Sequence, residues 1–118
     1  MTTASAVWAA VETGRGRGFL PAHAFTTIHY LAVRARGPKF ARQAIEDLLR
    51  VFDVASVDAA VIRHATTLGW ADFEDAVCAA AAAASHCEAI VSRHVSGFRG
   101  SPVPAIDPAA ALAWLTVA

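Results

Sequence analysis

The sequence predicts an α/β protein in which helices alternate with short apolar strands. The stretches 19–20, 53–55, 89–92 and 103–106 are short and largely apolar, whereas the segments between them have helical spacing of apolar residues. Strands joined by helices usually form a parallel sheet with helices over both faces. A chain of 118 residues, of which 56% are hydrophobic, suits one compact domain over residues 1–118.

The charge balance and the cysteine content narrow the function classes. Ten basic and ten acidic side chains cancel, so any contact with nucleic acid would need a local basic patch. Cys78 and Cys87 do not define a disulfide framework, and no secretory signal precedes them. The longest apolar run, 76–84, is too short to cross a bilayer. We therefore expect reduced thiols, no membrane partner and a cytoplasmic protein.

The first elements are predicted from the spacing of apolar residues and from the glycines and proline that end them. Residues 4–13 have the apolar spacing of a helix, and the glycines and arginines of 14–18 end it. The strand 19–20 should stop at Pro21, which lacks a backbone donor for a ladder hydrogen bond.

Two helices are predicted next, over residues 23–35 and 39–50. Gly37-Pro38 separates them, because glycine and proline together disfavour a continuous helix. The second helix has a clear apolar stripe, made of Phe40, Ala44, Ile45, Leu48 and Leu49.

The middle of the chain is a strand followed by a capped helix. The strand centres on 53–55, and Asp58 is a plausible N-cap for a helix over 59–68 that ends at Gly69.

An alanine-rich helix follows, with acidic residues at its start. Asp72 is the predicted N-cap, and Asp75, three residues on, gives an acidic variant of the capping box. The helix extends to about Ser85, and the alanines of 79–84 allow close packing on the sheet.

The last elements are two strands and a helix. Residues 89–92 form one strand, and 103–106 form another whose Pro104 indicates an edge position. Asp107 and Pro108 have the order typical of a helix start, cap then proline.

A candidate site arises where the acidic helix start could meet the end of strand 89–92. That strand ends in Ser92-Arg93-His94, and ligands bind beyond the carboxyl ends of parallel strands. Clustered carboxylates such as Asp72 and Asp75 suit a hard cation such as Mg2+. Simpler interpretations remain open, in which the two acids only cap the helix and His94 is a loop histidine without a role.

Two strings carry a family resemblance. DFEDAVCAAAAAASHCEAIVSRHVSGF, followed by SPVPAIDPAAALAWL, resembles the C-terminal half of a PIN domain, a family that includes the toxins of bacterial VapBC toxin–antitoxin pairs. The family pattern is an acid opening a small-residue helix, a strand ending in Thr-Arg-Asp or Thr-Arg-Asn, an aromatic residue and an edge strand. The resemblance implies a three-layer α/β/α sandwich with a parallel sheet.

The resemblance also implies a metal-dependent endoribonuclease that holds one or two Mg2+ or Mn2+ ions between three or four acids. Asp75 matches the acid that opens the small-residue helix, and Asp72 is a second candidate. His94 stands where the family has another metal ligand. Beside that strand end, Ser92, Arg93 and Arg99 are the expected contacts to RNA.

The chain departs from the family pattern at several positions. It has no initial strand with an Asp-x-Asn motif, and Thr27 and Gly97 stand where two further acids are expected. In the family the initial strand is central, between the equivalents of 19–20 and 89–92. Without it those two strands either close up, leave exposed edges or accept another chain between them. A late start codon and a naturally reduced protein both fit.

Three functions remain open from the sequence. The first is a VapC-like Mg2+-dependent endoribonuclease toxin whose activity is impaired by the lost acids. The second is a non-catalytic PIN-like protein that binds itself, as a homodimer, or an antitoxin-like partner on helices 23–35 and 39–50. A third and weaker possibility is an unrelated α/β domain that binds a small ligand at the strand ends.

Overall fold

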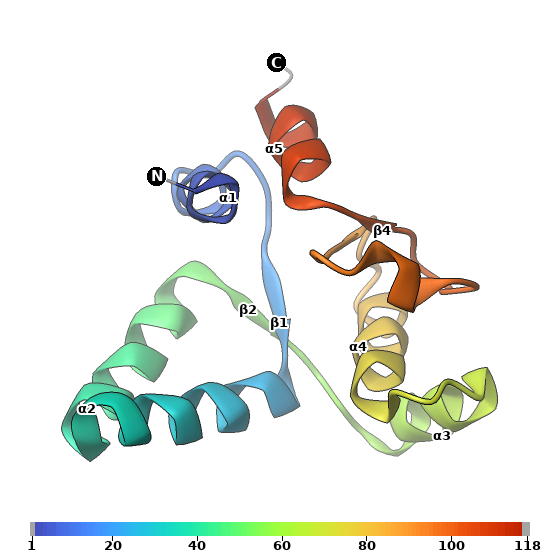
Figure 1. Ribbon diagram of the computed structural model, residues 1–118, viewed down its shortest axis with the longest axis horizontal. Helices are drawn as coiled ribbons and strands as arrows, with labels where there is room; N and C mark the ends of the chain where they lie inside the picture. Colours follow the sequence, from blue (N-terminus) through green and yellow to red (C-terminus); the bar gives the residue numbers. More distant parts are fainter. Residues whose placement is uncertain (1, 117–118) are drawn as a thin grey trace.

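Helices and short strands alternate along residues 2–116, the part of the chain that the computed structural model describes. In chain order they are α1 (Thr3–Glu12), β1 (Phe19–Pro21), α2 (Ala22–Val51), β2 (Asp53–Ala55), α3 (Ala59–Leu68), α4 (Phe73–Ala84), β3 (Ile90–Val91), the 3-10 turn η1 (Val95–Phe98), β4 (Ala105–Ile106) and α5 (Pro108–Thr116) (Figure 1).

The strands pair in parallel, as predicted for an α/β protein, but they form two separate pairs. In one pair Phe19 is opposite Asp53 and Pro21 is opposite Ala55. In the other, Ile90 is opposite Ala105. Each pair is a two-stranded sheet of its own, so β1 and β3 do not close up into one continuous sheet.

Three strands differ in length from the prediction: β3 is Ile90–Val91 where 89–92 was predicted, and the other two differ at a proline. The strand predicted to stop before Pro21 includes it. The Gly18 carbonyl accepts from the Asp53 N–H at 2.9 Å. Successive residues of a strand point their backbone N–H and C=O groups to opposite edges, so the nitrogen of Pro21 faces away from β2. The proline therefore removes no hydrogen bond to β2. The last strand begins at Ala105, one residue after Pro104.

The predicted helix caps are present. The Asp58 carboxylate accepts from the Val61 N–H at 3.0 Å, and the Asp107 carboxylate accepts from the Ala110 N–H at 2.8 Å. Gly69 ends α3 in the left-handed conformation with φ of 67°. The two capping carboxylates and the left-handed glycine explain why the predicted helix boundaries lie close to the observed ones.

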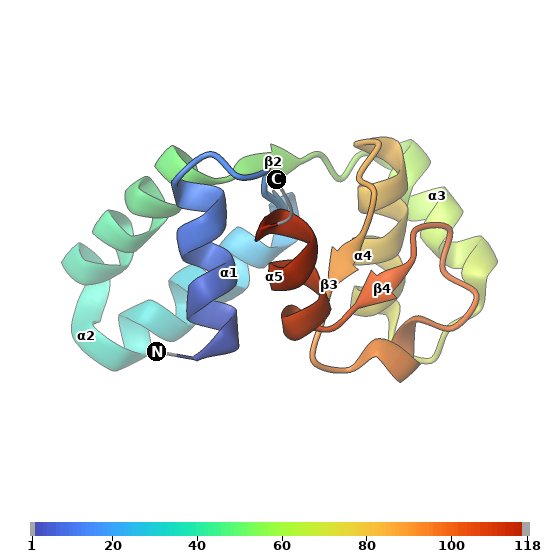
Figure 2. The same ribbon diagram turned by 90° about the horizontal axis from the view of Figure 1, so that it is seen from above.

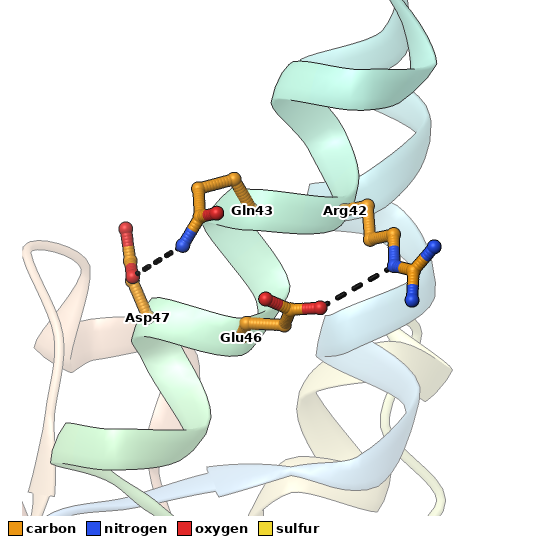
Figure 3. A network of polar contacts seen from close by, with 4 residues as sticks. All are labelled: Arg42, Gln43, Glu46 and Asp47. Carbon is orange, nitrogen blue, oxygen red and sulfur yellow. Dashed lines mark hydrogen bonds and ion pairs between the residues drawn. The ribbon is translucent and has the colours of Figure 1, made fainter.

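The α2 segment is two helices in one run, as the Gly37-Pro38 pair predicts. Gly37 has φ of 86° and ψ of 175°, which no helix contains. The segments before and after it form a hairpin (Figure 1). The polar face of the second segment carries a pair between Arg42 and Glu46 at 3.3 Å and a hydrogen bond from Gln43 to Asp47 at 3.0 Å (Figure 3).

The hydrophobic core lies where α3 and α4 pack on each other and on the first strand pair. Its buried members are all alanine or valine, and these small side chains let the helix backbones approach closely. The buried residues are Ala55, Val61, Ala65, Ala76, Val77, Ala80 and Ala81, and Phe19, Val57, Leu68 and Trp70 pack around them.

The two ends of the described chain meet, with α1 and α5 side by side (Figure 2). The ring of Phe52 packs edge-on to Trp8 with centroids 5.0 Å apart. A Cβ on Gly18 would lie 2.7 Å from the Phe52 ring, so this position requires glycine. Within residues 2–116, no helix is both long and apolar enough to cross a membrane.

Candidate functional site

Asp72 and Asp75 lie at the start of α4, where the sequence predicts them. An oxygen of the Asp72 carboxylate accepts the backbone N–H of Asp75 at 3.0 Å, which makes Asp72 the N-cap. Glu74 and Asp75 occupy the first turn of the helix. Three carboxylates therefore gather at one helix end, and one of them is already engaged with the backbone.

The Asp75 carboxylate lies against the turn that follows β3. A Cβ on Gly97, in η1, would lie 3.5 Å from the Asp75 Oδ2 atom. The N-cap residue of η1 is His94, and η1 contacts α4. The predicted meeting of the acidic helix start with the end of strand 89–92 is therefore present, and we call this place the Asp75 notch.

An aromatic pair holds η1 in this position. Phe98 is buried, and its ring packs edge-on to Trp70 with centroids 5.7 Å apart and planes at 86°. Trp70 lies just before α4, so the pair fixes the turn after β3 to the start of α4. The sequence does not predict η1, because a single 3-10 turn has no periodic signal.

The Asp75 notch carries uncompensated negative charge. Burial raises the pKa of the Asp75 carboxyl above 3.8, and the neighbouring Asp72 and Glu74 charges raise it further, while His94 opposes them. Repulsion among carboxylates of this kind favours a bound proton or a cation beside Asp75.

Ser92, His94 and two arginines flank η1 along the chain. The His94 N–H donates to the Ser92 hydroxyl oxygen at 3.0 Å, and the Ser92 N–H donates to the Ile106 carbonyl at 3.0 Å in the β3–β4 ladder. Arg93 and Arg99 are exposed on either side of η1. The loop is thus held by backbone bonds, and both guanidinium groups remain accessible to solvent.

The acids fit only part of a divalent-cation site. Asp72 and Asp75 offer the oxygen ligands that Mg2+ and Mn2+ prefer. Within residues 2–116, however, no group of three or more His, Cys, Asp or Glu side chains is arranged to hold a metal ion. Asp72, Asp75 and His94, the predicted ligands, therefore do not form a complete set within this chain.

A second pair of side chains near the site was missed from the sequence. The Cys78 sulfur lies 3.6 Å from the His23 Nε2 atom, although 55 positions separate the residues, so no spacing could reveal the pair. The His23 Nδ1 atom is buried without a partner. Burial raises the Cys78 pKa to about 11, helped by Asp75, so the thiol is neutral and is not an activated nucleophile.

Comparison with known proteins gives one finding. A family model described as PIN domain matches residues 1–96, which include α1 through β3 and the acids of the Asp75 notch. No curated protein and no solved structure matches the chain.

Proposed function

Because this chain belongs to the PIN domain family, we propose that it is a VapC-like endoribonuclease-class protein whose site is the Asp75 notch. Membership of this family supports a nuclease-like function for the chain. The observation that carries the assignment to this place is the approach of the Asp75 carboxylate to Gly97, since it brings the acidic helix start to the turn that follows a parallel strand.

The proposed substrate is RNA, bound with its phosphate at the notch. Arg93 and Arg99 would contact flanking phosphates, because both are exposed next to η1. The Ser92 hydroxyl oxygen already accepts from His94, so its proton remains available for a phosphate oxygen. Asp75 and Asp72 would contribute oxygen ligands to Mg2+ or Mn2+.

We also propose a cytoplasmic location for the protein. Cys78 and Cys87 are both free thiols, which supports it.

We further propose that this chain alone cleaves RNA weakly or not at all. Two carboxylates and a histidine supply less negative charge than the three or four acids that the PIN family resemblance implies. Burial and, after it, the neighbouring Asp72 and Glu74 charges raise the Asp75 pKa, and a weakly held cation would offset this cost only partly.

An RNA-cleavage assay with the purified chain tests both parts of this proposal. In Mg2+ or Mn2+ we expect slow cleavage or none, and any cleavage should disappear in Asp75→Asn. Rapid Mg2+-dependent cleavage lost in Asp75→Asn would contradict the impairment alone. Cleavage that survives Asp75→Asn unchanged would contradict the assignment of the site.

Glu74→Gln is the matched control for Asp75→Asn. Glu74 lies in the same helical turn but is exposed, and its carboxylate is not the one that lies against η1. We expect Glu74→Gln to keep whatever cleavage the unsubstituted chain has, because it removes charge without removing the proposed ligand.

A second candidate function is a non-catalytic interaction protein, and the α2 hairpin supports it. The hairpin makes its main contacts to the body through β1 and β2, and it leaves large apolar side chains in solvent. Tyr30 and Leu31 are each 58% exposed, and Phe40 and Leu49 are also exposed. Apolar surface of this kind favours a partner, either an antitoxin-like protein or a second copy in a homodimer.

Light scattering on the purified chain tests the homodimer. If the hairpin forms the interface, Leu31→Asp should convert dimers to monomers, whereas the matched exposed substitution Ile62→Asp on α3 should not. If the chain is a monomer at all concentrations, the homodimer is contradicted, and the second function would then require a different protein as the partner.

A further inference from the structure

Basic side chains cluster on both sides of Gly37, where the α2 hairpin turns. The cluster is made of the exposed residues Arg34, Arg36, Lys39 and Arg42. No acidic residue occurs in the sequence between Glu12 and Glu46. In a chain with zero net charge, the turn of α2 is therefore a local positive surface.

Most of this positive charge has no carboxylate beside it. Within residues 2–116, Arg42 is the one member of the cluster that forms an ion pair, with Glu46 at 3.3 Å, and its side chain is still 84% exposed. Lys39 stands in the first turn of the helical segment after Gly37, where the helix dipole favours acidic side chains over basic ones. Helix stability therefore does not explain the charge of Lys39, and a bound anion would be favoured beside it.

Two exposed aromatic residues, Tyr30 and Phe40, lie among these cations. The Arg34 guanidinium lies over the Tyr30 ring, 5.7 Å from its centroid, and its Nη1 atom donates to the Tyr30 hydroxyl at 3.1 Å. The Arg36 guanidinium lies over the Phe40 ring at 5.2 Å. A nucleic-acid base can stack on such a ring or on the guanidinium plane while a phosphate meets the charge. We call the four cations and the two rings the hairpin tip.

The hairpin tip is uncovered and lies away from the Asp75 notch. A Cβ on Gly37 would meet no other segment of the chain within 4 Å, so the turn is open to a ligand. Both ribbon views place the turn of α2 and the α3–α4 pair at opposite ends of the molecule (Figure 1, Figure 2). The hairpin tip is therefore a surface distinct from the notch at the start of α4.

We propose that the hairpin tip binds a single-stranded nucleic acid, with phosphates at the cations and bases stacked on Tyr30 and Phe40. A duplex fits less well, because its bases stack on each other and do not reach the rings. A second copy of this chain is disfavoured, because two tips would bring like charges together. An acidic polypeptide offers carboxylates but no bases to stack. The proposal concerns binding only and does not rest on nuclease activity at the Asp75 notch.

Fluorescence anisotropy with labelled oligouridylate and oligothymidylate of about twelve nucleotides measures this binding. In EDTA at about 50 mM salt no metal-dependent cleavage occurs, and the carboxylates of the Asp75 notch repel phosphate. We expect saturable binding of at least one of the two strands. The slope of log affinity against log salt should be about −2 to −3, because three or four phosphate contacts release counterions. The ratio of the two affinities shows whether the hairpin tip prefers RNA or DNA.

Two matched pairs of substitutions test the location. Phe40→Leu removes a ring from the hairpin tip, and Phe73→Leu removes a similarly exposed ring from α4, the two residues being 42% and 47% exposed. Phe40→Leu should weaken binding at least about fivefold, and Phe73→Leu should leave it within about twofold. Lys39→Gln should make the salt slope shallower by about 0.7, whereas Arg63→Gln, at an exposed position of α3, should not change it.

Several results would overturn the proposal. They are no binding by either single strand, binding that Phe40→Leu and Lys39→Gln leave unchanged, and equal losses in the matched controls. A duplex that binds as tightly as the better single strand would also overturn it. The same holds for polyglutamate, and the hairpin tip would then be a surface for an acidic protein. RNA cleavage with Mg2+ bears on the proposed function alone, because binding is measured in EDTA.

Discussion

The α3–α4 side of the molecule and the α2 hairpin bury their apolar residues to very different extents. In the 12 residues of α4, six are buried, five of them alanines, and four of the six lie against α3 and the first strand pair. In the 30 residues of α2 only Ala41 and Leu48 are buried. Small side chains allow close helix packing where a partner element is present, whereas the larger apolar residues of α2 have no such element over them.

This difference indicates that the α3–α4 side stabilises the fold, whereas the α2 hairpin offers a surface for interaction. The close-packed side carries Asp75, so the candidate site stands at the start of a helix that is packed against the core. The hairpin contributes exposed apolar surface and, on its second segment, polar pairs that include Arg42–Glu46 and Gln43–Asp47 (Figure 3). Such a surface suits a partner more than a core.

The largest effect should come from enlarging a side chain inside the packed side. Ala81 is fully buried, so Ala81→Leu should lower the free energy of unfolding by about 3 kcal/mol through overpacking. Ala84→Leu, on an exposed position of the same helix, should change it by less than about 0.5 kcal/mol. Urea unfolding measures both, and similar values for the two variants would show that α4 is not close-packed.

Neighbouring leucines test the hairpin in the same way. Leu48 is 7% exposed and Leu49 is 51% exposed. We expect Leu48→Ala to cost about 2 kcal/mol and Leu49→Ala close to nothing, since only the first leaves a cavity. Thermal unfolding of the two variants gives the comparison, and an equal cost would mean that Leu49 is covered in solution.

A stabilising change is expected at the end of α4. His86 has φ of 57°, and the N–H of Cys87 donates to the Ala82 carbonyl at 2.9 Å, a left-handed helix end that glycine suits. His86→Gly should raise the free energy of unfolding by about 0.5–1 kcal/mol. Ser85→Gly, where φ is negative, should give no gain. The urea midpoints of unfolding distinguish the two variants. A lower stability of His86→Gly would show that the left-handed backbone of His86 does not cost free energy.

The smallest expected effect is the pH dependence of Asp75. Its pKa is raised in the folded state above the unfolded value near 3.8, so the folded state binds more protons just above that pH. Stability from this group is therefore lost as pH rises through the folded pKa. Asp75→Asn should be slightly more stable than the unsubstituted chain at about pH 7, and the difference should vanish below pH 3.8.

Urea unfolding at both pH values measures this difference. A variant that is less stable than the unsubstituted chain at about pH 7 would show that Asp75 is stabilised, not repelled, by its neighbours.

Local features of the fold were predictable from the sequence because their causes are local. Caps at Asp58 and Asp72, the break at Gly37 and the left-handed Gly69 each depend on residues a few positions apart. The acidic start of α4 was recognised for the same reason.

Features that depend on distant residues were not predictable. The pairing of His23 with Cys78 and the packing of Phe98 on Trp70 join segments with no common motif. The split into two strand pairs is decided by which backbone groups meet in space, and strands of two or three residues have too little pattern to specify that.

Amide line broadening by Mn2+ tests the central claim most directly, namely that the functional site is the notch between Asp75 and the turn after β3. In the labelled chain we expect millimolar Mn2+ to broaden Asp75 and Gly97 together, because a Cβ on Gly97 would lie only 3.5 Å from the Asp75 Oδ2 atom. Asp75→Asn should remove the broadening and Glu74→Gln should keep it. Broadening elsewhere, or broadening that persists in Asp75→Asn, would contradict the account.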